Sequence, residues 1–226
     1  MRAPISVIIP TLNAATALPG CLGSLVEGLE IGLIRELIVS DGGSEDQTVD
    51  LARDWGGEVI TGPASRGAQL RRGCARAKAD WLLILHADTQ LAPGWTGPVG
   101  AHLSTEYAGY FKLAFDRGGA PVAAWANFRA RRFDLPYGDQ GLLIRRGLYE
   151  AVGGYQDIPL MEDVAMARAL KGQLTALDAV AVTSAEKYRA QGWIGRGSRN
   201  LWTLMRYFAG VSPEALAKSY RAPRKD

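Results

Sequence analysis

Two aspartates follow apolar stretches of the sequence, at positions where a carboxylate can bind a charged ligand. Asp41 follows the apolar run 37–39 and precedes two glycines, and Asp88 comes three residues after the apolar run 81–85. A hard divalent cation typically takes one or two such protein carboxylates together with the phosphates of its substrate. Either aspartate alone is also typical of a turn, in which its side chain hydrogen-bonds the nearby backbone. Together the two favour a nucleotide site.

Three more acids lie in the second half of the chain. Glu162 and Asp163 stand at the start of a predicted helix, where the helix dipole favours the ionised form of a carboxylate. Capping of that helix is one interpretation, and a general base is the other. Asp139 lies in the polar stretch 137–141, between a basic helix and a strand, and is a further candidate.

The motifs of three common enzyme classes are missing from the sequence. After the first apolar run the chain has Pro-Thr-Leu-Asn at 10–13, and not the Gly-x-Gly-x-x-Gly of a dinucleotide-binding dehydrogenase. Neither the P-loop of a phosphohydrolase nor the Gly-x-Ser-x-Gly elbow of a hydrolase occurs. No nucleic-acid motif accompanies the basic residues, so we do not expect nucleic acid as a partner.

Short apolar runs alternate with helical patterns in the first half of the chain. Strands are predicted at 5–9 (closed by a proline), 37–39, 58–61 and 81–85, and helices over 18–29, from Ser44 onward and over 67–78. Strands that are apolar throughout, alternating with helices, indicate an α/β fold with a mostly parallel sheet and helices on both faces. Ligands of such sheets bind beyond the carboxyl ends of the strands, where the candidate residues fall.

One residue pair in the first half predicts where a helix begins, and after Asp88 the alternation of strand and helix is less regular. Ser44 with Gln47 three residues on matches a capping box, which predicts that a helix starts at Ser44. After Asp88, strands are predicted at 107–115 and 142–144, and helices over 122–132, before 153–154, over 162–170 and over 193–208.

The chain has no internal repeat and no clear linker, so we predict one domain over 1–226. Within it we expect a nucleotide-binding half at 1–90, a catalytic half at 91–192 and a C-terminal helical segment at 193–226. Cys21 and Cys74 lack a metal-like spacing and are predicted to be reduced, apolar residues. No apolar run approaches the ~20 residues of a membrane-spanning helix, and no secretory signal is recognisable, so we expect a cytoplasmic protein.

Several motifs together resemble the family 2 glycosyltransferases. They are Val-Ile-Ile-Pro-Thr-Leu-Asn at 7–13, Val-Ser-Asp-Gly-Gly-Ser at 39–44, Leu-His-Ala-Asp at 85–88 and Met-Glu-Asp at 161–163. More narrowly, the chain is similar to the bacterial "transferase 2, radical-SAM/selenodomain-associated" branch. That branch shares His-Ala-Asp-Thr at 86–89, Pro-Tyr-Gly-Asp-Gln at 136–140 and Ile-Pro-Leu-Met-Glu-Asp-Val at 158–164.

This resemblance implies a GT-A type, Rossmann-like fold and transfer of a sugar from a nucleotide-diphosphate donor, with a UDP-sugar favoured, to an acceptor hydroxyl. It also implies a divalent cation, Mn²⁺ or Mg²⁺, and inversion at the anomeric carbon. Asp88 matches the last residue of the family's D-x-D metal motif, and His86 replaces the first. Asp163 matches the catalytic base, Glu162 is expected to orient the acceptor, and Asp139 is the next candidate base.

The donor site implied by the resemblance is built from both halves of the chain. Asp41 corresponds to the residue that binds base and ribose. The other expected donor-binding residues are Pro10, Thr11, Asn13, Gly42, Arg66, Gln69, Ala87, Gly138 and Gln140. For Arg66 a solvated loop charge is the alternative. Ala14 and Ala15 stand where many relatives carry Glu, and Arg72 stands where the branch often has Asn, which leaves the identity of the donor open.

Two other functions stay open. The single carboxylate of the metal motif allows a nucleotide-sugar-binding protein without turnover, and a related α/β core allows a nucleotidyltransferase. The Gly-rich, basic loop of the latter is missing after the first strand. Release of nucleoside diphosphate, release of pyrophosphate, or binding alone would distinguish the three functions.

The C-terminal segment is basic although the formal net charge of the chain is only +3. Residues 187–226 hold nine Lys or Arg and two acids, and the predicted helix 193–208 adds large apolar side chains. Such a helix can lie in a membrane interface, which would suit a lipid-like acceptor and a location at the inner face of the membrane. Packing of these apolar residues on the domain is the alternative.

Overall fold

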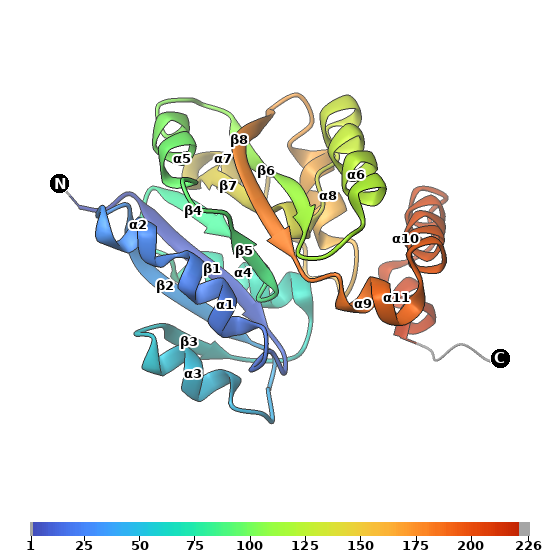
Figure 1. Ribbon diagram of the computed structural model, residues 1–226, viewed down its shortest axis with the longest axis horizontal. Helices are drawn as coiled ribbons and strands as arrows, with labels where there is room; N and C mark the ends of the chain where they lie inside the picture. Colours follow the sequence, from blue (N-terminus) through green and yellow to red (C-terminus); the bar gives the residue numbers. More distant parts are fainter. Residues whose placement is uncertain (1, 222–226) are drawn as a thin grey trace.

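The computed structural model describes residues 2–221, apart from a few side chains near the C-terminal helices, at 187, 190, 191, 194 and 221. Within this range the chain folds into one mixed sheet flanked by helices (Figure 1). The strands are β1 Ile5–Thr11, β2 Ile34–Asp41, β3 Glu58–Thr61, β4 Trp81–Ile84, β5 Thr89–Leu91, β6 Ala108–Phe115, β7 Leu142–Arg145 and β8 Leu174–Thr183.

Helices follow most of these strands. They are α1 Leu18–Ser24, α2 Val26–Glu30, α3 Thr48–Asp54, α4 Arg66–Arg76, α5 Thr96–His102, α6 Ala120–Phe133, α7 Arg146–Ala151, α8 Glu162–Ala169, α9 Glu186–Gln191, α10 Trp193–Phe208 and α11 Pro213–Arg221, with a 3-10 turn at Gly138–Gln140. None of the helices within residues 2–221 combines the length and apolar character needed to cross a bilayer.

The sheet has a parallel half and a mixed half. Its strand order is β3-β2-β1-β4-β7-β6-β8-β5, and β3, β2, β1 and β4 are mutually parallel. β7 then pairs antiparallel with β4, and β5 pairs antiparallel with β8. The predicted parallel arrangement is confirmed for the first half, and the carboxyl ends of β1, β2 and β4 therefore open toward the same edge.

Each face of the sheet carries its own core, because successive side chains of a strand point to opposite faces. In β1, Val7 and Ile9 join the cluster under α1 and α5, whereas Ile8 joins the cluster under α4 and α8. Burial of such a side chain contributes roughly 1.5–3 kcal/mol each, so both faces stabilise the sheet. Cys21 lies in the first cluster and Cys74 in the second, both as free thiols. Burial raises the pKa of each to about 12, which keeps them protonated.

Three local expectations are wrong. The strand does not end at Pro10, because β1 continues to Thr11 in register with β2. The helix predicted from Ser44 begins only at Thr48, because the Ser44 hydroxyl donates to Asp41 (2.6 Å) instead of capping a helix. The helix predicted over 18–29 is interrupted at Leu25 and forms α1 and α2.

The predicted helix 193–208 is confirmed as α10. It packs on the domain through Leu204, which forms a small cluster with Leu135, Val164 and Ala167. Trp193, at the start of α10, packs edge-on against Phe115 of β6, with 5.1 Å between the ring centroids. Four large apolar side chains of α10 stay about half exposed: Leu201, Trp202, Met205 and Phe208. The packing interpretation therefore holds for Trp193 and Leu204, and not for these four. Figure 1 places α10 and α11 at the end of the molecule away from the N-terminus.

Candidate active site

The carboxyl ends of β1 and β2 are tied together by the loop after Asp41. The buried Asp41 carboxylate accepts hydrogen bonds from the Thr11 hydroxyl (2.9 Å), the Gly43 N–H (2.8 Å) and both donors of Ser44. Burial opposes ionisation, but these hydrogen bonds hold the pKa of Asp41 below its ordinary value. The ionised side chain is thus fully engaged in shaping the loop.

Gln69 of α4 joins the same strand ends from the other side. Its amide donates to the Thr11 carbonyl (2.7 Å) and the Ser40 carbonyl (3.0 Å), and Gly42 packs against it. Neither Asp41 nor Gly42 reaches the cavity beyond the strands. In this structure Asp41 shapes the loop at the end of β2 through its hydrogen bonds, and the contact of these two residues with the donor stays a prediction.

A cavity of about 370 Å³ does open in front of β1 and β4. Its wall includes six of the predicted donor-site residues: Pro10, Thr11, Asn13, Arg66, Gln69 and Ala87. Asn13 adopts a left-handed conformation (φ 50°), and its side-chain oxygen accepts the Glu45 N–H (2.9 Å). This bond fixes the rim of the cavity at the end of β1.

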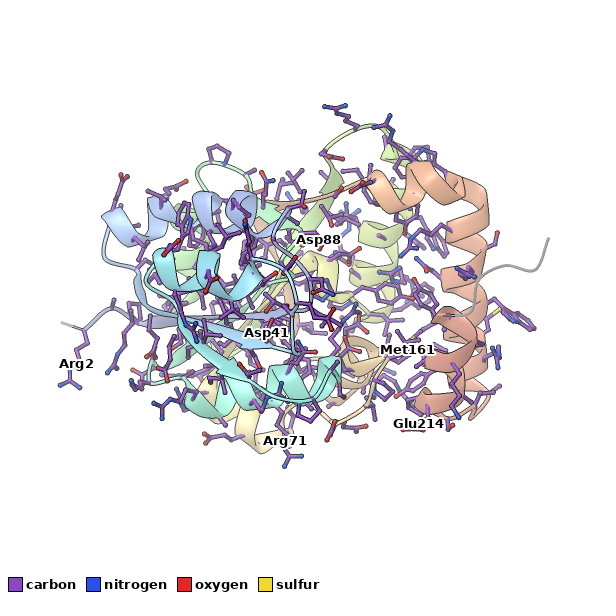
Figure 2. All side chains as sticks on the ribbon, turned by 90° about the horizontal axis from the view of Figure 1, so that it is seen from below. Arg2, Asp41, Arg71, Asp88, Met161 and Glu214 are labelled. Carbon is purple, nitrogen blue, oxygen red and sulfur yellow. The ribbon has the colours of Figure 1, made fainter. Side chains whose placement is uncertain are left out.

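A second cavity, of about 470 Å³, lies between the sheet and the C-terminal helices. It shares Arg66, His86, Asp88 and Ser184 with the first, so the two are continuous at the metal motif. Figure 2 shows Asp88 and Met161 in the middle of the molecule, with the C-terminal helices at one end. The predicted base, Asp163, lines this second cavity.

Asp163 is oriented by two backbone donors. Its Oδ2 accepts the Gly138 N–H (2.9 Å), and its Oδ1 accepts the Val164 N–H (2.7 Å). Gly138 also packs against the His86 imidazole, and a Cβ at this position would collide with that ring. The backbone of Gly138 therefore joins the metal motif to the start of α8. Met161, which precedes α8, has φ 68°, a conformation rare for a non-glycine residue and typical of functional sites.

Glu162 forms an ion pair with Arg66, with 3.4 Å between its Oε1 and the guanidinium Nη1. Its Oε2 is buried without a hydrogen-bond partner among the described residues. Burial, and to a lesser degree the charge of Asp163, raises the pKa of Glu162 to about 7 against the opposing charge of Arg66. For Glu162, desolvation therefore outweighs the effect of the helix dipole, which favours the ionised form. Arg66 is a partner of Glu162, and not a solvated loop charge.

Asp139 and Gln140, the neighbours of Gly138, point in different directions. Asp139 lines the second cavity, and its Oδ1 is buried without a partner among the described residues. Burial raises the pKa of Asp139 to about 6, although the charge of Arg129 opposes the shift. Gln140 is fully buried, and its amide donates to the Phe111 carbonyl (3.2 Å). Gln140 therefore supports β6, and its contact with the donor stays a prediction.

The C-terminal helices contribute residues that sequence reasoning did not assign to the site. Arg196, Arg199 and Tyr220 line the second cavity together with Asp88. The Arg196 guanidinium donates to the Tyr220 hydroxyl (3.1 Å) and lies 5.5 Å from the Tyr188 ring centroid. The sequence signal was the group of arginines in this helix, which was interpreted as a membrane-facing charge.

The donor set fits a cation that arrives with phosphates. Among the described residues no group of three or more His, Cys, Asp or Glu could hold a metal ion by itself. Asp88 and His86 lie where the two cavities meet, and a hard cation needs only one or two carboxylates when substrate phosphates complete its shell. These residues therefore suit a cation shared with a diphosphate.

Comparison with known proteins agrees with this geometry. Residues 6–155 match the family described as glycosyl transferase family 2. A PGL/p-HBAD biosynthesis glycosyltransferase of Mycobacterium tuberculosis is 33% identical over 176 residues, which cover 69% of this chain. The match covers 64% of that relative, so the chain spans about two thirds of the length of the curated relatives it matches.

Solved structures share the fold at low identity. Staphylococcus aureus TarS in complex with UDP-GlcNAc superimposes with a TM-score of 0.64 at 15% identity, over 80% of this chain and 58% of that one. Glucosyl-3-phosphoglycerate synthase from M. tuberculosis in complex with Mn²⁺, UDP and glucosyl-3-phosphoglycerate gives 0.54 at 22% identity, over 80% and 70%. These likenesses show the GT-A-like fold. The family match over residues 6–155, together with the relative of 33% identity, shows that the chain belongs to glycosyl transferase family 2.

Proposed function

We propose that this chain transfers a sugar from a nucleotide-diphosphate donor, with a UDP-sugar favoured, to an acceptor hydroxyl with inversion. The observation that best supports this proposal is that the two cavities meet at Arg66, His86 and Asp88. The predicted base, Asp163, lines the second cavity. The first cavity would hold the nucleotide and the second the sugar and acceptor. The bound UDP-GlcNAc of TarS and the Mn²⁺ and UDP of the synthase support the choice of donor.

The proposed chemistry assigns one proton transfer and one displacement. Asp163 accepts the proton of the acceptor hydroxyl, whose oxygen forms a bond to the anomeric carbon as the bond from that carbon to the diphosphate breaks. The two backbone N–H donors hold the Asp163 carboxylate in a fixed orientation. Glu162 holds the Arg66 guanidinium beside the cavities, where it can meet the donor phosphates. Asp139 is the alternative base.

Asp88, with His86 as a secondary ligand, would hold Mn²⁺ or Mg²⁺ against the donor phosphates. Bound there, the cation neutralises the charge of the departing nucleoside diphosphate. His86 adds no charge to the ligand set, and its ring is fixed against Gly138. We therefore infer that the cation binds together with the donor.

We extend the proposal to the setting of the reaction. The motifs at 136–140 and 158–164 support membership of the bacterial branch named above. The half-exposed apolar side chains of α10 support a lipid-like acceptor reached from the cytoplasmic face of a membrane, with residues 193–226 as the contact.

The test measures UDP release from a panel of UDP-sugars with Mn²⁺, with thermal shift as a parallel measure of donor binding. We expect Asp163→Asn to keep donor binding and to lower turnover by about 10²–10⁴, the usual contribution of a positioned base. Asp50→Asn on α3, an exposed aspartate, is the matched control and should change neither. Near-normal turnover in Asp163→Asn would move the base to Asp139.

One observation favours a second candidate. Asp88 supplies the single carboxylate of the metal motif, which would suffice for donor binding without turnover. A wild-type protein that is stabilised by UDP-sugars but releases no UDP with any acceptor would favour this binding function. Release of pyrophosphate from a nucleoside triphosphate and a sugar phosphate would instead favour a nucleotidyltransferase.

A further inference from the structure

A third cavity, of about 700 Å³, forms a groove between α6 and α10. Its walls are mainly apolar, with Val122, Trp125 and Phe133 from α6 and Leu201, Leu204 and Phe208 from α10. Charged side chains also line it: Arg129, Asp134, Arg168 and Lys171. α6 packs on β6, and Figure 1 shows α10 at the same end of the molecule, farther from the sheet. We call this feature the α6–α10 groove.

The apolar side chains around the α6–α10 groove are not covered by other parts of the fold. Trp125 is 51% exposed, Phe133 55% and Phe208 52%. Exposed large apolar side chains that are scattered singly need no explanation, but a contiguous group around a groove marks a binding surface. The occupant must therefore be apolar along most of its length.

The inner end of the groove is polar and belongs to the active site. Tyr137, Asp139, Tyr188 and Asn200 line both the α6–α10 groove and the second cavity. Asp139 stands at this end with its unpartnered Oδ1. A molecule that fills the groove thus places one end beside the carboxylates of the second cavity.

We propose that the α6–α10 groove holds the apolar chain of the acceptor, an amphiphile whose hydroxyl head lies in the second cavity near Asp139 and Asp163. This inference rests on the proposed function and specifies the acceptor class. A second copy of the chain would not explain why the groove continues into the active site. The polar inner end and apolar outer walls match a single molecule with one hydroxylated and one apolar end.

A substitution at one glycine can block the groove. Gly197 of α10 lines it, and a Cβ there would meet no atom within 4 Å. Gly197→Trp therefore fills the groove without a clash at the backbone. Gly100 of α5 has the same open surroundings but lies outside the groove, so Gly100→Trp is the matched control. Trp125→Ser is an independent second variant, at a half-exposed position where folding tolerates the change.

The probes are hexyl, heptyl and octyl β-glucosides below their micelle concentrations, with binding measured by calorimetry. In the wild-type protein and in Gly100→Trp, we expect affinity to rise about fourfold for each added methylene, as burial of a methylene predicts. Gly197→Trp should bind the octyl compound at least ~10-fold more weakly and lose the chain-length dependence, because the plug removes the apolar contacts. Trp125→Ser should lower the affinity in the same direction.

Equal chain-length dependence in Gly197→Trp and the wild-type protein would overturn the proposal. So would a concentration-dependent dimer that Gly197→Trp abolishes while no glucoside binds, because a second copy would then occupy the groove. Thermal shift with UDP-sugars and Mn²⁺ on the same variants tests the proposed function separately from the groove, since the donor site is built from other elements. If no UDP-sugar stabilises the wild-type protein, the proposed function fails, while the glucoside series still decides whether the groove binds amphiphiles.

Discussion

Two buried carboxylates of this protein respond to burial in opposite ways. Asp41 accepts hydrogen bonds from Thr11, Gly43 and Ser44, and these donors lower its pKa despite its burial. Glu162 has one guanidinium at 3.4 Å and an Oε2 without a partner among the described residues, and its pKa rises to about 7. The number of donors, and not burial alone, decides which acid is ionised at neutral pH.

The raised pKa of Glu162 predicts a pH-dependent stability. Between the ordinary pKa of 4.5 and about 7, the unfolded chain ionises while the folded protein stays protonated, so stability falls as pH rises through this window. We expect Glu162→Gln to exceed the wild-type free energy of unfolding at pH 8, with the difference shrinking toward pH 5. Urea titrations across this range measure it, with exposed Glu45→Gln as the control, and a wild-type protein that is the more stable at pH 8 contradicts it.

The metal motif yields a second prediction for single residues. Asp88 supplies the charge that attracts a hard cation, whereas a neutral imidazole prefers later transition metals. Asp88→Asn should therefore abolish Mn²⁺-dependent binding of a UDP-sugar, and His86→Ala should only weaken it. Calorimetry with UDP and Mn²⁺ measures both variants. An unchanged affinity of Asp88→Asn for UDP in the presence of Mn²⁺ would contradict the assignment of Asp88 as the metal ligand.

At this scale, sequence reasoning placed residues better than it oriented them. Asp88 and Asp163 line the second cavity as expected, because each follows a recognisable apolar run or begins a helix. Asp41 and Gln140 lie at the expected positions in the chain, but their side chains point inward to backbone and hydroxyl partners. The direction of a side chain depends on contacts distant in sequence, such as that of Gln140 with Phe111, and no local pattern contains them.

The elements around the site are held by close backbone approaches. The N-terminus of α4 docks on the loop before α8, where the Gly67 N–H donates to the Ile158 carbonyl (3.1 Å). A Cβ at Gly67 would collide with the Gln156 carbonyl, which belongs to the backbone and cannot rotate away. This docking places Arg66 beside Glu162, so one glycine couples the donor side to the catalytic side.

Gly67→Ala should therefore destabilise the protein by about 1–3 kcal/mol or more, the usual cost of overpacking. It should also weaken UDP-sugar binding, because Arg66 shifts with its helix. Gly100→Ala is the control, since its Cβ would meet open space, and there the substitution should stabilise by roughly 0.5–1 kcal/mol. Thermal unfolding measures both changes. A Gly67→Ala variant as stable as Gly100→Ala would show that the docking is loose.

Element prediction succeeded where the pattern was strong and local. The strand at 58–61 and the helix at 193–208 match the structure, because an apolar β-branched run and a long amphipathic pattern are each distinctive. β8 was not predicted although it has ten residues. Its sequence, LTALDAVAVT, contains three alanines and an aspartate, which are poor strand formers, and pairing with β6 and β5 overrides that preference.

For the whole molecule, the arrangement of the sheet explains why the site lies where it does. The parallel half ends at β4, and the antiparallel pairing with β7 begins there. His86 and Asp88 follow β4 at this change of direction, so they face both the donor cavity and the second cavity. The division into parts at 1–90, 91–192 and 193–226 stays a prediction.

The exposed apolar residues at one end of the molecule predict a membrane contact. Trp125, Phe128 and Phe133 of α6 form an exposed ring cluster, and Trp202 and Met205 of α10 are more than half exposed. Basic side chains of the same two helices accompany them: Arg131, Arg132 and Arg206. Burial of aromatic residues at the membrane interface and attraction of cations to anionic headgroups each contribute weakly to binding, and the two contributions add.

We expect the protein to sediment with anionic vesicles at low ionic strength and to be released as salt rises, because screening removes the cationic share of the attraction. Trp202→Ser should lower the bound fraction at every salt concentration, because it removes apolar contact and no charge. Trp55→Ser, at an exposed tryptophan after α3, is the matched control and should bind like the wild-type protein. Neutral vesicles should retain less protein than anionic ones. A protein that stays in the supernatant with anionic vesicles at low salt would instead indicate an acceptor delivered from solution, with the α6–α10 groove as its only apolar contact.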